Sequence, residues 1–485
     1  MTIEYATAWL LPLFAGCGIW WLLHAPQRRS GDVLASLGGG WIVGILLAAL
    51  AAGVLAREYP VNAVGRVGPW LAGVGVLAWL GAGLRLWRSR PCVPDPVPVR
   101  AGLGWRALGW LLLALVLLRL AVLVDEAALR PLFAWDAWSA WAVRPKSWIL
   151  LGHADDYVPM VDWLASAPAP ERTMLAWNYP ELLAWIEVWF ASGAGGWNEP
   201  LVNLAWAGAL AAFAAALYGQ ARAFGLAPWM AMALVYALVS LPLIDAHVAL
   251  AGYADLWVGV VLGLALLAWA RWLVFRGPGQ WLLAVLLAAC LPAIKLDGAI
   301  WLLCFGLLVL LERLPPRWRW GTLGVAALLV LAGLALGGFT LPVPGVGGIR
   351  IAWGRIDIPG VATYVMQWHP VGAAMLASLF TLPNWHLLWY LLPVVVLLRL
   401  DALRRSAAAR LLGLFVLLQV AALFVLFFMT SAAAWAEDFT SVNRLILQVV
   451  PGVFVFLAVL LRGAATEAGR VAPAPHLPHD AGSAF

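Results

Sequence analysis

Hydrophobic segments of roughly 20 residues recur along the whole chain and are separated by mostly short polar stretches. A helix needs about this length to cross a hydrocarbon core of about 30 Å, and it hydrogen-bonds its own backbone there. The alternation typical of transmembrane β-strands is not seen in the sequence. We therefore predict an all-α polytopic membrane protein with about thirteen transmembrane helices. They are expected at about 5–24, 33–56, 67–87, 105–124, 198–221, 226–245, 253–274, 279–294, 297–312, 320–338, 383–399, 410–430 and 443–462.

Composition supports this class of protein. Charged residues make up 11% of the chain and the mean hydropathy is +0.91, whereas soluble domains contain about a quarter charged residues. The net charge of +6 does not indicate a nucleic-acid partner, because arginines such as Arg29, Arg85, Arg222 and Arg313 fall on one side of the predicted membrane, as the positive-inside rule requires. This pattern predicts an N-terminus outside and a C-terminus in the cytoplasm.

Four regions follow from the spacing of the spans. Residues 1–90 form an N-terminal three-span module, and residues 91–104 form a proline-rich cytoplasmic linker that favours an extended conformation. Residues 105–462 form the main membrane domain, with large outer loops at 125–197 and 339–383. The Pro/Ala-rich segment 463–485 is predicted to be a disordered cytoplasmic tail.

The first outer loop contains an apolar segment, 177–190, that hydropathy alone would assign to a span. It carries Glu181 and Glu187, and counting it as a crossing would place every later basic loop on the wrong side. We therefore expect an amphipathic helix on the outer surface, with its tryptophans at the level of the lipid headgroups.

Asp136 is the leading candidate for a catalytic base. It lies between Trp135 and Trp138 in the first outer loop, and a carboxylate held between aromatic walls can accept a proton from a hydroxyl group. The alternative is a solvated acid beside interfacial aromatic residues. Asp125 and Glu126, directly after the fourth span, compete for the same role, or they simply end that helix.

The two lysines are candidates for phosphate contacts. Lys146 and Lys295 stand in a chain with 30 basic residues, and a lysine offers a compact point charge to a phosphate oxygen. The alternative is compositional drift. Lys295 lies at the tip of a short helical hairpin, where a charge is costly without a partner, and Asp297 could be only that partner. Arg444, at the outer start of the last span, is either a phosphate or acceptor contact or an interfacial anchor.

Other polar residues give weaker indications. His153, Asp155 and Asp156 resemble a sparse cation site but lack a third ligand at helical spacing, so a structural or acceptor-side acidic turn is favoured and no metal or cofactor is expected. Asp255 is expected to cap the helix that follows it, and lining a donor pocket is the alternative. His369 either orients a sugar or phosphate or has no such role.

Several short motifs occur in a fixed order along the main domain. They are Trp135-Asp-Ala-Trp-Ser-Ala-Trp with Arg144-Pro-Lys146, Asn178-Tyr179-Pro-Glu181, Gly252-Tyr-Ala-Asp255, Lys295-Leu-Asp-Gly298 and Ser441-Val-Asn-Arg444. Together they resemble the landmarks of GT-C fold glycosyltransferases, the polyprenyl-phosphate-sugar-dependent membrane enzymes related to protein mannosyltransferases and aminoarabinose transferases. The resemblance covers about 105–462. Many relatives carry the essential acid almost directly after the preceding span, where this chain has Asp125 and Glu126.

The resemblance implies a function. A sugar would pass, with inversion, from a polyprenyl-phosphate donor to an envelope lipid, glycan or protein on the outer side of a bacterial inner membrane, facing the periplasm or exterior. An aspartate in the first outer loop would be the base. The residues expected to contact substrate are Lys146, Lys295, Arg444, Arg144, Asp156, Tyr179 and His369. A transporter or flippase of lipid-linked sugars is the alternative, and a non-catalytic scaffold is a third.

Overall fold

The computed structural model describes residues 2–24, 29–88, 102–166, 171–343, 347–359 and 362–462. The predicted tail 463–485 and most of the predicted linker 91–104 lie outside these ranges. Within them, nine helices are long and apolar enough to cross a membrane, which confirms a helical multi-pass membrane protein. They are α1 (Ile3–Leu23), α2 (Asp32–Leu55), α3 (Ala63–Arg88), α4 (Leu103–Leu129), α8 (Glu199–Ala223), α11 (Ala254–Phe275), α14 (Pro316–Ala335), α18 (Ala407–Met429) and α20 (Val442–Leu460).

Four predicted spans correspond to shorter or broken helices. The segment predicted as 226–245 forms α9 (Pro228–Val239) and α10 (Pro242–Ala249), which are bent by 62° where Pro242 begins the second helix. The other three are α12 (Pro278–Ile294), α13 (Gly298–Arg313) and α16 (Leu388–Leu398), none of which reaches the roughly 20 residues of a typical span. The count of thirteen therefore stays a prediction.

Glycines bring α1, α2 and α8 into close contact. A Cβ atom on Gly16 would lie 1.8 Å from the carbonyl oxygen of Gly40, and one on Gly44 would lie 1.9 Å from that of Pro12. On the other side of α2, a Cβ on Gly38 would lie 2.0 Å from the carbonyl oxygen of Ala212 in α8. Small residues at such positions let helix backbones approach closely in a membrane. They also join the N-terminal helices to the main domain.

Helix α7 (Leu182–Gly193) corrects one prediction. All its residues are buried, whereas the sequence predicted a helix on the outer surface. Trp189 donates to the Ala8 carbonyl at 2.8 Å, and the ring of Phe190 lies 4.8 Å from that of Trp9. Tryptophans suit a headgroup region and a protein interior equally well, and here α1 and α2 provide the interior.

The segment predicted as the second outer loop contains strands that were not predicted from the sequence. They form one antiparallel sheet in the order β1-β2-β3-β4. The strands are β1 (Phe339–Val343), β2 (Gly347–Ala352), β3 (Arg355–Ile358) and β4 (Ala362–Val365). This small sheet is an addition to an otherwise helical architecture.

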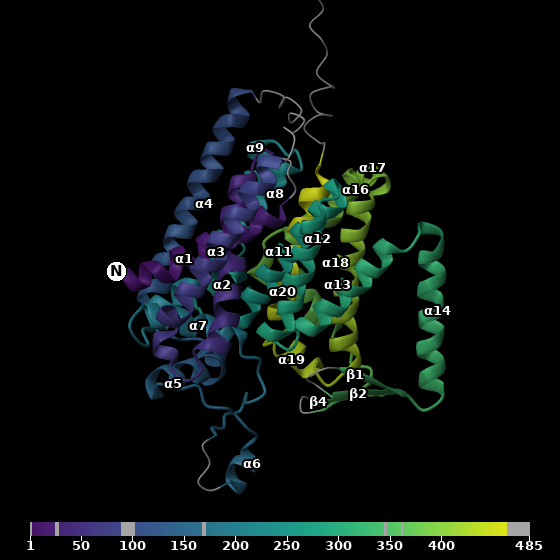
Figure 1. The fold of residues 1–485 in the computed structure, drawn as a ribbon. Coiled ribbons are helices and arrows are strands. Elements are labelled where there is room, and N and C mark those ends of the chain that lie inside the picture. Colours follow the sequence, from purple (N-terminus) through teal and green to yellow (C-terminus); the bar gives the residue numbers. More distant parts are fainter. Residues whose placement is uncertain are drawn as a thin grey trace, which may run out of the picture.

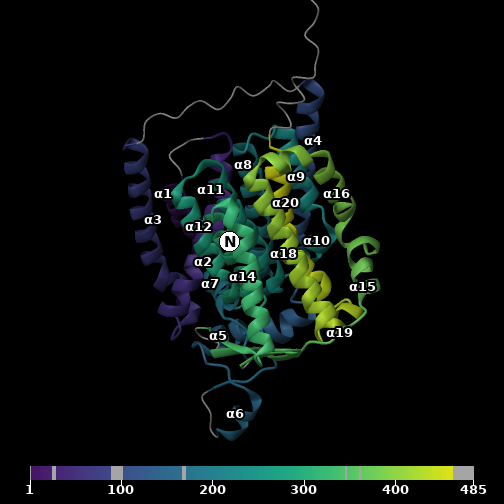
Figure 2. The ribbon, with the colours of Figure 1, turned by 90° about the vertical axis from the view of Figure 1, so that its right-hand side faces the viewer.

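Short helices mark the two ends of the bundle. They are η1 (Pro60–Asn62), η2 (Ala137–Trp141), α5 (Val143–Leu151), α6 (Met160–Ala165), α15 (Gly372–Leu376), η3 (Ala377–Thr381), η4 (Pro383–Trp385), α17 (Leu400–Arg405) and α19 (Ala433–Glu437). Helices α5, α6 and α19 and the sheet lie at one end, called here the loop end, in both Figure 1 and Figure 2, and α17 lies at the opposite end in Figure 1.

Helices α11 and α20 form the centre of the bundle. All residues of α20 except Arg444, and nearly all of α11, are buried. A Cβ on Gly259 would lie 3.3 Å from the Cα of Gln448, and one on Gly263 would lie 2.8 Å from the Cβ of Pro451, so both glycines allow close packing. This contact fixes the loop ends of the two helices relative to each other, and the candidate site lies there.

Candidate functional site

Five charged side chains from four separate segments meet at the loop end of α11 and α20. Asp136 precedes η2, Asp255 lies in the first turn of α11, Lys295 and Asp297 join α12 to α13, and Arg444 lies in the first turn of α20. We call these residues the Lys295 cluster. Four of the five sequence motifs that carry the family resemblance contribute to it.

Lys295 is held by two carboxylates. Its Nζ lies 2.8 Å from Oδ1 of Asp255 and 2.8 Å from Oδ2 of Asp297. Burial by itself lowers the pKa of Lys295, but the two carboxylates outweigh it and raise the pKa above its usual value. The ammonium group is therefore charged at any physiological pH.

Asp255 does not cap its helix, so that prediction was wrong. Tyr253 occupies the N-cap position and makes no capping bond through its side chain. Asp255 is fully buried and accepts hydrogen bonds from Lys295 and, at 2.6 Å, from Nε2 of Gln448. A buried carboxylate needs such partners, and Lys295 supplies the compensating charge.

Asp136 forms an ion pair with Arg444, 308 residues later in the chain. Arg444 also donates through Nε to the Thr440 carbonyl at 2.9 Å, and its guanidinium carbon lies 5.1 Å from the ring centre of Tyr253. These contacts fix the guanidinium group in one orientation. The first and last motifs of the main domain thus meet directly.

Gly252 lets the turn before α11 approach η2. Its φ is +109°, a conformation that favours glycine, and a Cβ there would lie 2.5 Å from the Cβ of Ala137. The next residue is fixed as well, because Trp206 donates to the Tyr253 carbonyl at 2.8 Å. This packing places Asp136 beside the start of α11.

Tyr179, a predicted substrate contact, lies near the cluster. Burial raises its pKa, and the charges of Lys295 and Asp136 act on it in opposite directions. Its ring centre is 4.5 Å from that of Trp141. Arg144 positions this segment, because it donates to the carbonyls of Tyr179 at 2.7 Å and of Trp177 at 2.6 Å. Arg144 is thus a buried residue that positions this segment through hydrogen bonds to two backbone carbonyls.

Three other predicted residues lie outside the cluster. Lys146 pairs with Glu199 at 2.9 Å, so the two lysines have separate partners. Asp125 is exposed on α4, and Glu126 pairs with Arg130 at 3.2 Å. The loop position predicted for the two acids is in fact the last turns of α4, which continues to Leu129.

His369 and the acidic turn also lie in contacts of their own. The backbone N–H of His369 donates to the Phe428 carbonyl at 2.8 Å. Asp156 pairs with Arg57 at 2.7 Å, and Asp155 pairs with Arg172 at 2.9 Å and His153 at 2.8 Å. Each acid of the suggested cation site thus has an arginine partner. Across the described residues, no group of three or more His, Cys, Asp or Glu side chains is arranged to bind a metal.

The sequence analysis missed Gln448 and Tyr364. Gln448 follows Arg444 by four residues and so lies on the same face of α20; a buried glutamine in an apolar span is the signal that could have identified it. The Oε1 atom of Gln448 also accepts a hydrogen bond from Nε1 of Trp301 at 2.5 Å. Tyr364 belongs to β4, and its pKa is raised by burial and further by the charge of Asp297. The unpredicted sheet therefore lies near the cluster.

The Lys295 cluster is partly open to solvent. The side chains of Asp136 and Asp297 are each 32% exposed, that of Arg444 is 20% exposed and that of Lys295 is 17% exposed. Two cations can therefore attract an anionic group, and a nearby carboxylate can accept a proton. Comparison with protein-family models, with curated proteins and with solved structures gives no match.

Proposed function

We propose that the chain is a membrane glycosyltransferase that moves a sugar from a polyprenyl-phosphate donor to an envelope lipid, glycan or protein on the outer side of a bacterial inner membrane. One observation carries the proposal. Asp136 and Arg444, from motifs at opposite ends of the main domain, form an accessible ion pair beside Lys295. This combines a base and two cations in the way that sugar transfer from a phosphate requires.

The roles follow from the bond changes. The bond between the anomeric carbon and the phosphate oxygen breaks, and its electron pair stays on the phosphate. A bond forms from the acceptor oxygen to the opposite face of the same carbon, and the acceptor proton passes to Asp136. Arg444 and Lys295 stabilise the charge that develops on the departing phosphate.

The Asp136–Arg444 pair also suggests how the base becomes free. A phosphate with more than one oxygen is a strong ligand for a guanidinium group, because both form charge-assisted hydrogen bonds. A donor phosphate bound to Arg444 would compete with Asp136 and release its carboxylate towards the acceptor. The base would then be available only when the donor is present.

Aromatic rings next to Asp136 suit a sugar. Trp135 and Trp138 are both exposed, and their ring centres lie 4.8 Å apart in an edge-to-face arrangement. Exposed indole rings offer flat apolar surfaces with a polar N–H group. They would contact the apolar face of a sugar while its hydroxyl groups remain hydrated.

The test is a transfer assay with purified protein, a synthetic polyprenyl-phosphate donor with a radiolabelled sugar, and a membrane extract as the acceptor source. Asp136→Asn is expected to lower the transfer rate by about 10²–10⁴-fold, the usual contribution of a general base. Its melting temperature should stay close to that of the parent protein. Asp125→Asn is the matched control, because Asp125 is an exposed acid on α4, and it should leave the rate unchanged.

Two outcomes would contradict these roles. Full activity in Asp136→Asn, together with loss in Asp125→Asn or Glu126→Gln, would move the base to the end of α4. Absence of transfer with every donor, together with movement of lipid-linked sugar across protein-containing vesicles, would identify a flippase instead.

A further inference from the structure

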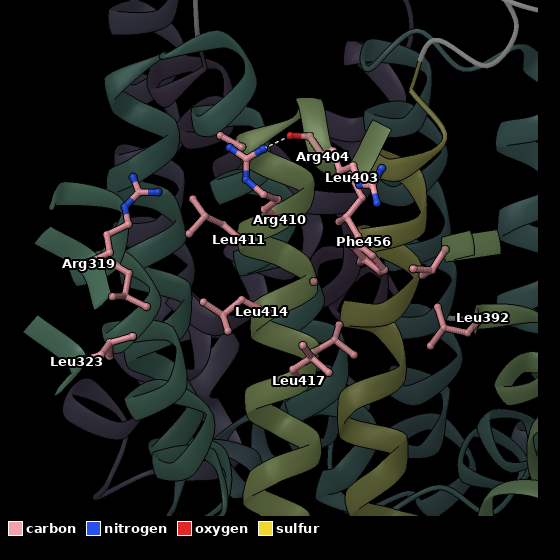
Figure 3. Close-up of a pocket in the computed structure, with 15 residues that line it drawn as sticks. Arg319, Leu323, Leu392, Leu403, Arg404, Arg410, Leu411, Leu414, Leu417 and Phe456 are labelled. Carbon is pink, nitrogen blue, oxygen red and sulfur yellow. Dashed lines mark hydrogen bonds between the residues drawn. The ribbon is translucent and has the colours of Figure 1, made fainter. Parts of the chain in front are cut away.

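A cavity of about 680 Å³ lies between α14 and the helices at the α17 end of the bundle. Arg319 and Leu323 come from α14, Arg404 comes from the last turn of α17, and Arg410 and Leu414 come from α18. In Figure 3 the three arginine side chains occupy the upper part of the cavity, and the leucines extend below them. The volume is within the range of small-molecule and lipid-chain pockets, about 300–1,000 Å³.

The cavity is basic at one end and apolar elsewhere. None of the 15 residues that line it is acidic. Arg410 donates to the Arg404 carbonyl, and Arg319 donates to the Leu314 carbonyl at 3.1 Å, so these hydrogen bonds orient the side chains but leave their charge uncompensated. Among the described residues, no carboxylate lies within ion-pair distance of these three arginines.

Two nearby arginines outside the cavity are paired with carboxylates. Arg405 pairs with Asp401 at 3.5 Å, and Arg276 pairs with Glu312 at 2.6 Å. The three arginines of the cavity instead bring uncompensated positive charge to the place where its apolar walls begin. A cationic rim above apolar walls complements a phospholipid, whose headgroup is negatively charged and whose acyl chains are apolar.

We propose that this cavity binds an anionic phospholipid, with its phosphate between Arg319, Arg404 and Arg410 and an acyl chain along Leu323, Leu414 and Leu417. A soluble anion would use only the arginines and would leave the apolar walls exposed. The inner side of α14 would also gain a partner, because α14 stands apart from the other helices in Figure 1 and none of its described residues is buried. Basic pockets between membrane helices bind acidic lipid headgroups by this chemistry.

The site is independent of the proposed transferase reaction. Its arginines lie at the α17 end, whereas the Lys295 cluster lies at the loop end. The proposed lipid site and the proposed transferase reaction can therefore be tested separately, and the lipid-binding experiment needs no sugar donor.

Native mass spectrometry of the full chain in mixed micelles with equimolar phosphatidylglycerol and phosphatidylcholine tests the proposal. The parent protein is expected to retain phosphatidylglycerol preferentially. The double variant Arg319→Gln/Arg404→Gln should bind it roughly 30-fold more weakly, since each basic residue contributes to attraction for acidic lipids. The matched control is Arg317→Gln/Arg405→Gln, which removes the same charge from the same two helices but from residues that do not line the cavity. It should retain the preference.

A second variant tests the apolar part of the site. Leu414→Trp fills the cavity, whereas Val420→Trp places the same ring on an exposed position of α18 outside it. Only Leu414→Trp should weaken phosphatidylglycerol retention. Equal retention of the two lipids by the parent protein would overturn the proposal, as would equal losses of phosphatidylglycerol binding in the two arginine double variants. Detection of a dimer without bound lipid would also overturn it, because a second copy of the chain would then cover the cavity.

Discussion

Helix α11 contributes one residue to each of two ion networks that differ in structure. One is the Lys295 cluster, which contains Asp255, and the other is a buried network around Arg271. The second network, the Arg271 cluster, consists of His24, Asp32, Gln220 and Arg271. Arg271 follows Asp255 by sixteen residues in α11, which at 1.5 Å per residue places the two roughly 24 Å apart. One helix therefore carries a polar cluster near each of its ends.

The Arg271 cluster is closed. Arg271 Nη1 donates to Asp32 at 2.8 Å and to Gln220 at 3.1 Å, and His24 Nε2 lies 3.2 Å from the second oxygen of Asp32. The side chains of Arg271 and Asp32 are only 1% and 3% exposed. The Lys295 cluster, by contrast, leaves Asp136 and Asp297 about one third exposed.

The difference separates a structural role from a functional one. A fully buried ion pair cannot meet a substrate, and its loss leaves an unpaired charge in the protein interior. A partly exposed pair can exchange its partner for a ligand at small cost. We therefore expect substitutions in the Arg271 cluster to change stability, and substitutions at the more exposed members of the Lys295 cluster, Asp136, Asp297 and Arg444, to change activity more than stability.

The largest expected effect on stability is that of Arg271→Met. It should lower the free energy of unfolding by about 3–5 kcal/mol, because it leaves Asp32 buried without its charged partner. Thermal unfolding in detergent measures the change. Arg276→Met is the control, because Arg276 directly follows the same helix, its side chain is 56% exposed, and Glu312 keeps Arg313 at 3.7 Å when Arg276 is removed. It should cost at most about 1 kcal/mol. Equal losses in both variants would remove the contrast between closed and open clusters.

Lys295→Met should lower both transfer and stability. Removing the ammonium group leaves the fully buried Asp255 with Gln448 alone, so the expected loss in unfolding free energy is about 3–5 kcal/mol, and transfer should fall by about 10²-fold or more. Rates and melting temperatures of the same preparations separate the two effects. Lys295→Arg keeps the charge, so partial activity in that variant would support a phosphate contact. A large stability loss with unchanged turnover would assign Lys295 a structural role.

The sequence predicted the helical architecture well because hydrophobic length is a local property. Apolar runs of sufficient length gave all nine long helices to within a few residues at most ends. The order of short motifs also anticipated that Asp136, Lys295 and Arg444 share one region. Their direct partners depend on side-chain geometry, however, and neither the Asp136–Arg444 pair nor the role of Gln448 could be read from spacing.

Other structural features could not be predicted from the sequence, for identifiable reasons. Helix α7 is rich in tryptophan and apolar residues, a composition that fits both a lipid interface and a protein interior, and only the positions of α1 and α2 decide between them. The sheet was missed because its strands are four to six residues long and are interrupted by glycine and proline. Spacing also could not show that Lys146 and Lys295 have separate partners, since Glu199, which pairs with Lys146, is 53 residues away.

The smallest expected effect concerns the pH dependence of the closed cluster. Burial lowers the pKa of His24, and the hydrogen bond to Asp32 only partly opposes this. In the unfolded chain a histidine has a pKa of about 6.5, so the unfolded state binds more protons as the pH falls through that value. The folded protein should therefore lose stability between pH 7.5 and 5.5.

Melting temperatures across this range, compared with those of His24→Gln, isolate the contribution of His24. The variant should show a weaker dependence on pH, whereas His153→Gln, at a side chain that is 54% exposed, should keep the parent slope. An unchanged slope in His24→Gln would mean that the imidazole is protonated together with Asp32 in the folded state.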